Sequence, residues 1–296
     1  MFDTLISAVA FGVVLASVVA IGSMGFTIQF GLTNMLNLSY GGVMTAAAFV
    51  AYILVSHHVS AWLGLVVGGL FGAVMTLAMG VYVFRPYARR GAKLFELMMV
   101  TLGLGLVIDY GLQALSRNNI YQFTVLQSAP IHLGPVVITP TQVILAAIGL
   151  AVFIGLELLL RLSRVGKALR ATAAEPSLAR SCGIRTGRVV TVTWLLSGFL
   201  CGLAGVVYAI DSQSIGYSSG QTFLPLVIAA ALLGGAGSPS GAVLAALAMG
   251  IVTQLVSALG QPAYSQVAGF AVLVIVLLAR PGAVGGGHNA EAQVTV

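Results

Sequence analysis

The sequence predicts an all-α membrane protein, a polytopic helical bundle of about eight to ten spans, and three observations support this fold class. The chain has 296 residues, of which 59% are hydrophobic and only 7% are charged, whereas soluble domains average about 25% charged residues. A membrane-spanning helix needs about 20 apolar residues, so this length suits nine or ten crossings in a single domain over residues 1–296. The apolar runs also lack the alternation of barrel strands. This composition excludes a cytosolic enzyme, a nucleic-acid-binding module and a disordered chain.

Each span is predicted from an apolar run that ends at a charge cluster or at Gly, Pro, Asn and Ser residues. The predicted spans lie near 5–28, 31–55, 61–84, 94–115, 140–160, 189–210, 222–233, 241–259 and 264–279.

The basic residues indicate how these spans are oriented. Twelve of the thirteen Lys and Arg residues fall in the loops 85–93 and 161–188 or directly after the last span, and Arg117 is the exception. Because cytoplasmic loops carry the excess of Lys and Arg, we expect these loops and the C-terminus in the cytoplasm. Loops 116–139 and 211–221 then face outward, and the Gly-rich tail 281–296 is expected to be disordered. The side of the N-terminus stays open, because region 28–45 departs from two simple crossings.

Two interruptions in the apolar pattern are candidates for a translocation path. The second one, Gly234 to Gly241, follows an apolar run of only 12 residues, about 18 Å of helix against a core of about 30 Å. Paired breaks in the two halves of a chain are typical of a substrate route in transporters, although ordinary turns between spans explain them equally well. The candidate path residues are Asn34, Asn37, Ser39, Tyr40, Gly41 and Gly42 at the first break, and Gly234, Gly235, Gly237, Ser238 and Gly241 at the second.

The basic loop 161–188 is predicted to contain a short helix over 176–182. Pro176 suits the first helical position and Gly183 suits the position after the C-cap. Leu178, Ala179 and Cys182 would share one face of this helix. A helix of two turns is unstable alone and needs a packing partner. That partner is either the membrane domain itself or a cytoplasmic protein that docks here.

Several alternatives are weakened by what the sequence lacks. Gly166 and Lys167 are followed by Ala168, so no P-loop for ATP occurs. The histidines lack the spacing of a metal site. Cys182 lies in a basic loop and Cys201 inside an apolar span, so we expect no disulfide between them.

Asp109 is the deepest ionisable residue in any span, and two interpretations of it stay open. It either faces the bundle interior beside a polar neighbour, or it is the ion-coupling group of a stand-alone channel or carrier. The glycines at four-residue spacing, Gly64–Gly68–Gly72 and Gly198–Gly202, favour close helix packing within the bundle over a dimer face.

Three motifs carry a resemblance to a known family. The first is Asn37-Leu38-Ser39-Tyr40-Gly41, and the second is the run with Gly234, Gly235, Gly237, Ser238 and Gly241. The third comprises Arg164, Gly166, Lys167, Ala168, Arg170 and Ala171, and continues with Ala173, Ala179, Gly183 and Ile184. The chain resembles the H-type permease subunits of branched-chain amino acid ABC transporters over residues 5–284. It departs from them at Ser39, Tyr40 and Glu175, where Ala, His and Asn or Asp are common.

This resemblance implies a type II importer permease that moves branched-chain amino acids or a similar small polar solute and is not itself an enzyme. It implies no cofactor or metal on this chain, two cytoplasmic ATPase subunits that bind ATP, a paralogous M-type permease, and a periplasmic or lipid-anchored binding protein. The location would be the inner membrane of a prokaryote, with no role for nucleic acid. The implied ATPase-coupling residues are Arg164, Gly166, Lys167, Arg170, Ala173, Glu175, Pro176, Leu178, Ala179, Cys182, Gly183 and Ile184.

Overall fold

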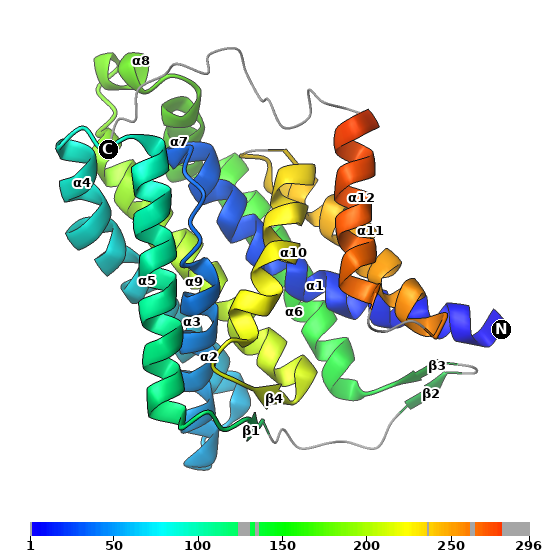
Figure 1. The fold of residues 1–296 in the computed structure, drawn as a ribbon. Coiled ribbons are helices and arrows are strands. Elements are labelled where there is room, and N and C mark those ends of the chain that lie inside the picture. The colour runs from blue at the N-terminus through cyan, green and yellow to red at the C-terminus, as the bar shows by residue number, and fades with distance from the viewer. Residues whose placement is uncertain (1, 124–130, 134–135, 236, 261–263, 280–296) are drawn as a thin grey trace.

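The computed structural model is a bundle of helices (Figure 1), and it describes residues 2–123, 131–133, 136–235, 237–260 and 264–279. The predicted tail 281–296 lies outside this part of the chain. The helices are α1 Phe2–Thr33, α2 Tyr40–Ser56, α3 Ala61–Met79, α4 Arg85–Arg89, α5 Leu94–Ser116, α6 Pro140–Leu162, α7 Arg164–Ala174, α8 Pro176–Ser181, α9 Thr186–Ser212, α10 Ser219–Leu233, α11 Pro239–Ala258 and α12 Ser265–Ala279, with a π-helical stretch at Gly80–Phe84.

Each of the nine predicted spans corresponds to an apolar helix, which confirms the fold class. Six helical segments are long and apolar enough to cross a membrane: Ile6–Thr33, Ala61–Ala88, Leu94–Ser116, Pro140–Leu162, Thr186–Ser212 and Pro239–Ala258. The remaining three predicted spans are shorter apolar helices, at Tyr40–Ser56, Ser219–Leu233 and Ser265–Ile275. Two of these short helices, α2 and α10, adjoin the predicted breaks.

The predicted boundary between the first two spans is wrong. We expected one span to end near 28 and the next to begin near 31, but α1 continues to Thr33. The chain leaves the helix at Asn34, which has a left-handed φ of 53°, a conformation that Asn tolerates better than most residues. The break therefore covers 34–39, and Tyr40, Gly41 and Gly42 are already helical.

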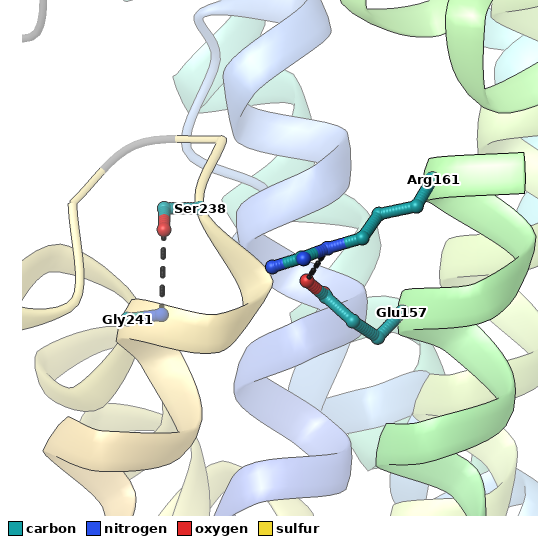
Figure 2. A network of polar contacts seen from close by, with 4 residues as sticks. All are labelled: Glu157, Arg161, Ser238 and Gly241. Atoms are coloured by element: carbon teal, nitrogen blue, oxygen red, sulfur yellow. Dashed lines mark hydrogen bonds and ion pairs between the residues drawn. The ribbon is translucent and has the colours of Figure 1, made fainter.

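The second break also ends earlier than predicted. Helix α11 begins at Pro239, so Ser240 and Gly241 are helical. Proline suits this first position because its missing N–H has no partner there in any case. The Ser238 hydroxyl accepts a hydrogen bond from the Gly241 N–H at 3.3 Å and so caps the helix (Figure 2).

The helices divide into a central and a peripheral group. Of the most apolar 18-residue stretch of each helix, 72% is buried within the protein in α9, whereas only 22% is buried in α5 and in α6. Helices α1, α2 and α9 contribute most of the fully enclosed side chains, including Met24, Phe26, Tyr40 and Met44. Helices α5 and α6 expose apolar side chains, as lipid-facing or subunit-facing helices do.

Glycines allow α3 and α9 to touch backbone to backbone. A Cβ atom on Gly198 would lie 2.5 Å from the carbonyl oxygen of Gly72, and one on Gly202 would collide with the carbonyl oxygen of Gly68. The predicted small-residue packing is therefore internal to this bundle.

Contacts at the two ends of the bundle join loops that were predicted to share a side. Strand β1 (Tyr121–Gln122) pairs antiparallel with β4 (Ser214–Ile215), which joins the two predicted outward loops. At the other end Arg85 donates to the Gly187 carbonyl at 3.1 Å, which joins the two predicted basic loops. Strands β2 (Ile131–Leu133) and β3 (Val136–Ile138) form a separate hairpin at the β1–β4 end (Figure 1).

The α3–α9 contact predicts a difference between two Gly→Ala variants. Gly198→Ala should lower stability by about 1–3 kcal/mol, because the added methyl overpacks the contact. Gly111→Ala, on α5 with no atom within 4 Å of the added Cβ, should be neutral or gain about 0.5–1 kcal/mol. Thermal unfolding in detergent measures both. Equal effects of the two substitutions would contradict the close packing.

Candidate functional site

The first break is an extended segment whose polar groups are bonded inside the protein. The Asn37 carboxamide oxygen accepts from the Ser39 N–H at 3.2 Å and from the Ser39 hydroxyl at 2.5 Å. The Leu38 N–H donates to the Thr101 hydroxyl of α5 at 3.1 Å. Irregular backbone at membrane depth is stable only where protein or water satisfies its hydrogen bonds. Here side chains supply those bonds, so the first break is a fixed structural element.

Gln29 of α1 is the buried residue that holds this break, and the sequence analysis missed it. Its side-chain oxygen accepts from Asn37 at 3.5 Å and from the Ser197 hydroxyl of α9 at 3.0 Å. Gln29 is 1% exposed, and its side-chain nitrogen has no hydrogen-bond partner among the described residues. One amide inside an otherwise apolar run was the signal available in the sequence.

Tyr40, another candidate path residue, is completely buried at the start of α2. Its hydroxyl donates to the Gly22 carbonyl of α1 at 3.0 Å, with the Ser197 carbonyl of α9 at 3.4 Å. Its ring packs edge-on against Phe26 at 5.5 Å between centroids. In this conformation Tyr40 joins α1, α2 and α9.

The second break is held by the same part of α1. The Thr27 hydroxyl donates to the Gly235 carbonyl at 3.2 Å and accepts from the Gly237 N–H at 3.1 Å. Gly235 and Gly237 have φ angles of 90° and 78°, which glycine adopts without strain.

The ends of this second break fold back closely on one another. A Cβ on Gly241 would collide with the carbonyl oxygen of Gly234. Figure 2 also draws Glu157 and Arg161 of α6, which form an ion pair with each other at 2.5 Å.

Both breaks thus bond to the C-terminal turns of α1, through side chains that leave the helix on different faces. Thr27 binds the second break, and Gln29, two residues later, binds the first. The predicted candidates differ in exposure. Asn34 and Gly237 are exposed, Gly234, Gly235, Ser238 and Gly241 are partly exposed, and Asn37, Ser39, Tyr40, Gly41 and Gly42 are buried.

The basic loop forms a second candidate site, and its helices α7 and α8 lie at the upper end of the bundle in Figure 1. The predicted short helix is present as α8, with Pro176 at its start and Gly183 at a φ of 82° after its end. The Gly183 N–H donates to Arg180 at 2.9 Å and the Ile184 N–H donates to Ala179 at 3.0 Å, a Schellman ending.

The faces of α8 are unequal, which corrects the predicted shared face. Ala179 is 4% exposed, whereas Leu178 is 62% exposed and Cys182 is also exposed. Only Ala179 packs on the protein, because Leu178 precedes it by one position, about 100° around the helix, and Cys182 lies after the end of α8.

Helix α7 was not predicted, although its apolar spacing in the sequence was a usable signal. Its inner face consists of Gly166, Leu169 and Thr172, at three-residue spacing. The Ser163 hydroxyl caps its start through the Gly166 N–H at 3.0 Å. The remaining coupling candidates on α7, Arg164, Lys167, Arg170 and Ala173, are all exposed.

The other predictions about ligands and cysteines can be placed on the structure. Cys182 and Cys201 are both free, one exposed and one buried. Among the residues that the structure describes, no three His, Cys, Asp or Glu side chains gather where they could hold a metal ion.

Comparison with known proteins identifies the family. The family described as branched-chain amino acid transport system / permease component matches residues 8–277. The chain belongs to this family. It is therefore a multi-pass membrane protein and the permease subunit of an ABC importer. It is not an enzyme and carries no cofactor, since ATP binds to separate ATPase subunits. This membership favours the importer over the stand-alone channel or carrier.

The relatives include amino acid and sugar permeases. The high-affinity branched-chain amino acid transport system permease protein LivH of Escherichia coli (strain K12) is 29% identical, and the match covers 91% of this chain and 92% of the relative. The corresponding protein BraD of Pseudomonas aeruginosa is 25% identical over the same shares. The ribose import permease protein RbsC of E. coli (strain K12) is 24% identical over 88% and 80%. No solved structure matches the chain. Permeases of the LivH type assemble with ATPases, a partner permease and a binding protein.

The Thr27 bridge predicts a specific loss in Thr27→Val. This near-isosteric change leaves the Gly235 carbonyl and the Gly237 N–H without a partner, at a cost of about 1–3 kcal/mol. We expect lower thermal stability and lower ATP-driven uptake.

Thr253→Val is the matched control, because the buried Thr253 hydroxyl bonds only to its own helix at Met249. If both variants kept the wild-type melting temperature and uptake, the bridge would have no role in holding the break.

Proposed function

We propose that this chain is the membrane-spanning permease of an ATP-driven importer for branched-chain amino acids or a similar small polar solute. The relatives support this proposal, because the amino acid permeases align with more of the chain, and of their own length, than the ribose permease does. The partners we propose are two cytoplasmic ATPases, a paralogous M-type permease and a periplasmic or lipid-anchored binding protein. The twelve cations at one end support a cytoplasmic C-terminus.

We propose that the solute passes beside the two breaks, close to the C-terminal end of α1 to which both are bonded. The exposed positions there are Asn34 and Gly237, which offer a carboxamide and backbone polar groups. The buried residues Asn37, Ser39, Tyr40, Gly41 and Gly42 support these positions from behind. Polar groups at the end of a helix break can replace part of the hydration of a passing solute.

We propose that α7 and α8, within loop 161–188, couple the permease to the ATPases. Helix α8 is anchored by Ala179 and by the bonds at Gly183, yet it presents Leu178 outward at 62% exposure. An exposed apolar side chain on a rigid, basic projection suits a protein groove better than water. Arg164, Lys167 and Arg170 are exposed on the preceding helix α7 and add positive charge to this loop.

The coupling role predicts that Leu178→Asp abolishes ATP-driven uptake, because a desolvated charge in the docking contact is costly. The protein should still insert and unfold at the wild-type temperature, since Leu178 supports nothing in this chain. ATPase recovered with the tagged permease from mild detergent, together with uptake, measures the effect.

Leu259→Asp is the control, because Leu259 is also 62% exposed but follows α11. Normal ATPase recovery and uptake with Leu178→Asp would remove α8 from the docking contact.

The proposed translocation path predicts different uptake by two Gly→Leu variants. Gly237→Leu adds bulk beside Gly31, whose Cα lies 3.6 Å from the added Cβ, and should lower uptake at least about tenfold through overpacking. Gly260→Leu carries similar backbone strain, since Gly260 has a φ of 85°, but its Cβ meets nothing within 4 Å. Uptake into vesicles with matched amounts of protein compares them. Similar losses in both variants would assign the effect to strain and not to the path.

A further inference from the structure

Asp109 is a buried carboxylate on a helix that is otherwise mostly exposed. It lies on α5, about two turns before the helix ends at Ser116. The neighbouring Leu106, Val107 and Tyr110 are exposed, whereas Asp109 is only 7% exposed. Asp109 therefore faces the interior of the bundle, which is one of the two interpretations that the sequence left open.

The carboxylate has one polar neighbour and one oxygen without a partner. Gln221, in the first turn of α10, hydrogen-bonds to the Asp109 side chain. The Oδ1 atom of Asp109 is enclosed and has no hydrogen-bond partner among the described residues. Among the described residues Asp109 forms no ion pair, since the one found there joins Glu157 and Arg161. No basic side chain in that part of the chain therefore compensates the Asp109 charge.

Glycines from two helices make room for this pair. A Cβ on Gly42 would lie 3.3 Å from Oδ1 of Asp109, and one on Gly41 would lie 2.5 Å from Oε1 of Gln221. A Cβ on Gly105 would lie 3.1 Å from Nε2 of Gln221. The pair therefore occupies a recess at the start of α2, directly after the first break.

The backbone around this recess is fixed. The Gly220 N–H donates to the Thr45 hydroxyl of α2 at 2.9 Å, and a Cβ on Gly220 would collide with the Gly41 carbonyl oxygen. The position of Gln221 beside α2 is thus set by backbone contact between α10 and α2.

An acidic side chain inside a membrane protein, without a basic partner, is costly unless something completes its bonding, and such residues mark substrate pathways. The group missing at Oδ1 is a hydrogen-bond donor, and a positively charged donor would bind most strongly. A solute ammonium group is such a donor, and ribose has none.

We propose that the Asp109 carboxylate, positioned by Gln221 against the glycines after the first break, binds the ammonium group of the transported solute. This inference rests on the proposed import of an amino acid. Because Oδ1 is enclosed in this structure, the solute reaches it in a state of the transport cycle in which α5 has moved away from α2.

The test uses the complete importer in vesicles with its ATPases, its partner permease and its binding protein, and the probes are leucine and ribose. Asp109→Asn keeps the size of the side chain and its contact with Gln221 but removes the charge. It should lower kcat/KM for leucine at least about tenfold, with basal ATP hydrolysis, elution and melting temperature unchanged. Asp109→Glu, which keeps the charge, should recover part of the uptake.

Glu157→Gln is the control, because it removes a carboxylate that is paired with Arg161 within α6, and it should transport leucine at the wild-type rate. Wild-type leucine uptake by Asp109→Asn overturns the ammonium site alone. A parallel loss of melting temperature and uptake in Asp109→Asn also overturns it, since the role is then structural. Wild-type import of ribose but not leucine overturns both the proposed solute and this site.

Discussion

The structure depends on one constraint, which is that two stretches of non-helical backbone lie within a membrane protein and need hydrogen-bond partners there. Helix α1 provides partners for both. The Thr27 hydroxyl satisfies the second break on both its donor and acceptor sides, and Gln29 holds the first through Asn37. Where the bonded groups are buried, the loss of one such partner is not compensated by solvent. The position of each break is therefore tied to α1.

Close backbone contact makes this arrangement possible. Helix α1 meets α11 where a Cβ on Gly12 would lie 2.8 Å from the Ile251 Cα, and α3 meets α9 through Gly72 and Gly198. Apolar side chains gain little by moving from lipid to another helix, so packing and backbone approach replace the hydrophobic effect as the cohesive force. A rigid central group of α1, α2 and α9 results, and the less buried α5 and α6 lie around it.

The two candidate sites belong to this rigid centre in different ways. The breaks are inside it, so movement of α1 relative to α10 or α2 would alter both at once. The basic projection of α7 and α8 is attached beside α9 and α6, and the Arg85 bond to Gly187 ties it to the neighbouring loop. A force applied at α8 would therefore reach the breaks through helices and not through flexible chain, which suits a permease driven by a separate ATPase.

The fold class, the start of each break and the residues that end α8 were predicted correctly because each depends on local chemistry. Composition requires membrane helices, Asn34 and Gly237 accept unusual backbone angles, and Pro176 and Gly183 suit only the ends of a helix. The end of α1 was predicted wrongly, because local pattern placed it before Gly31 while the helix continues to Thr33. Helix α7 was missed, although its three-residue spacing was present.

The sequence by itself determined which residues break the helices and which end of the bundle is basic, since both follow from residue type and order along the chain. Only the tertiary structure decided that the two breaks share α1, that Gln29 and Gln221 are functional candidates, and that Tyr40 is buried between three helices. These facts depend on contacts between residues as far apart as Thr27 and Gly235. The physical reason is that a buried hydrogen bond needs both partners in place, and the packing of the helices determines which residues meet.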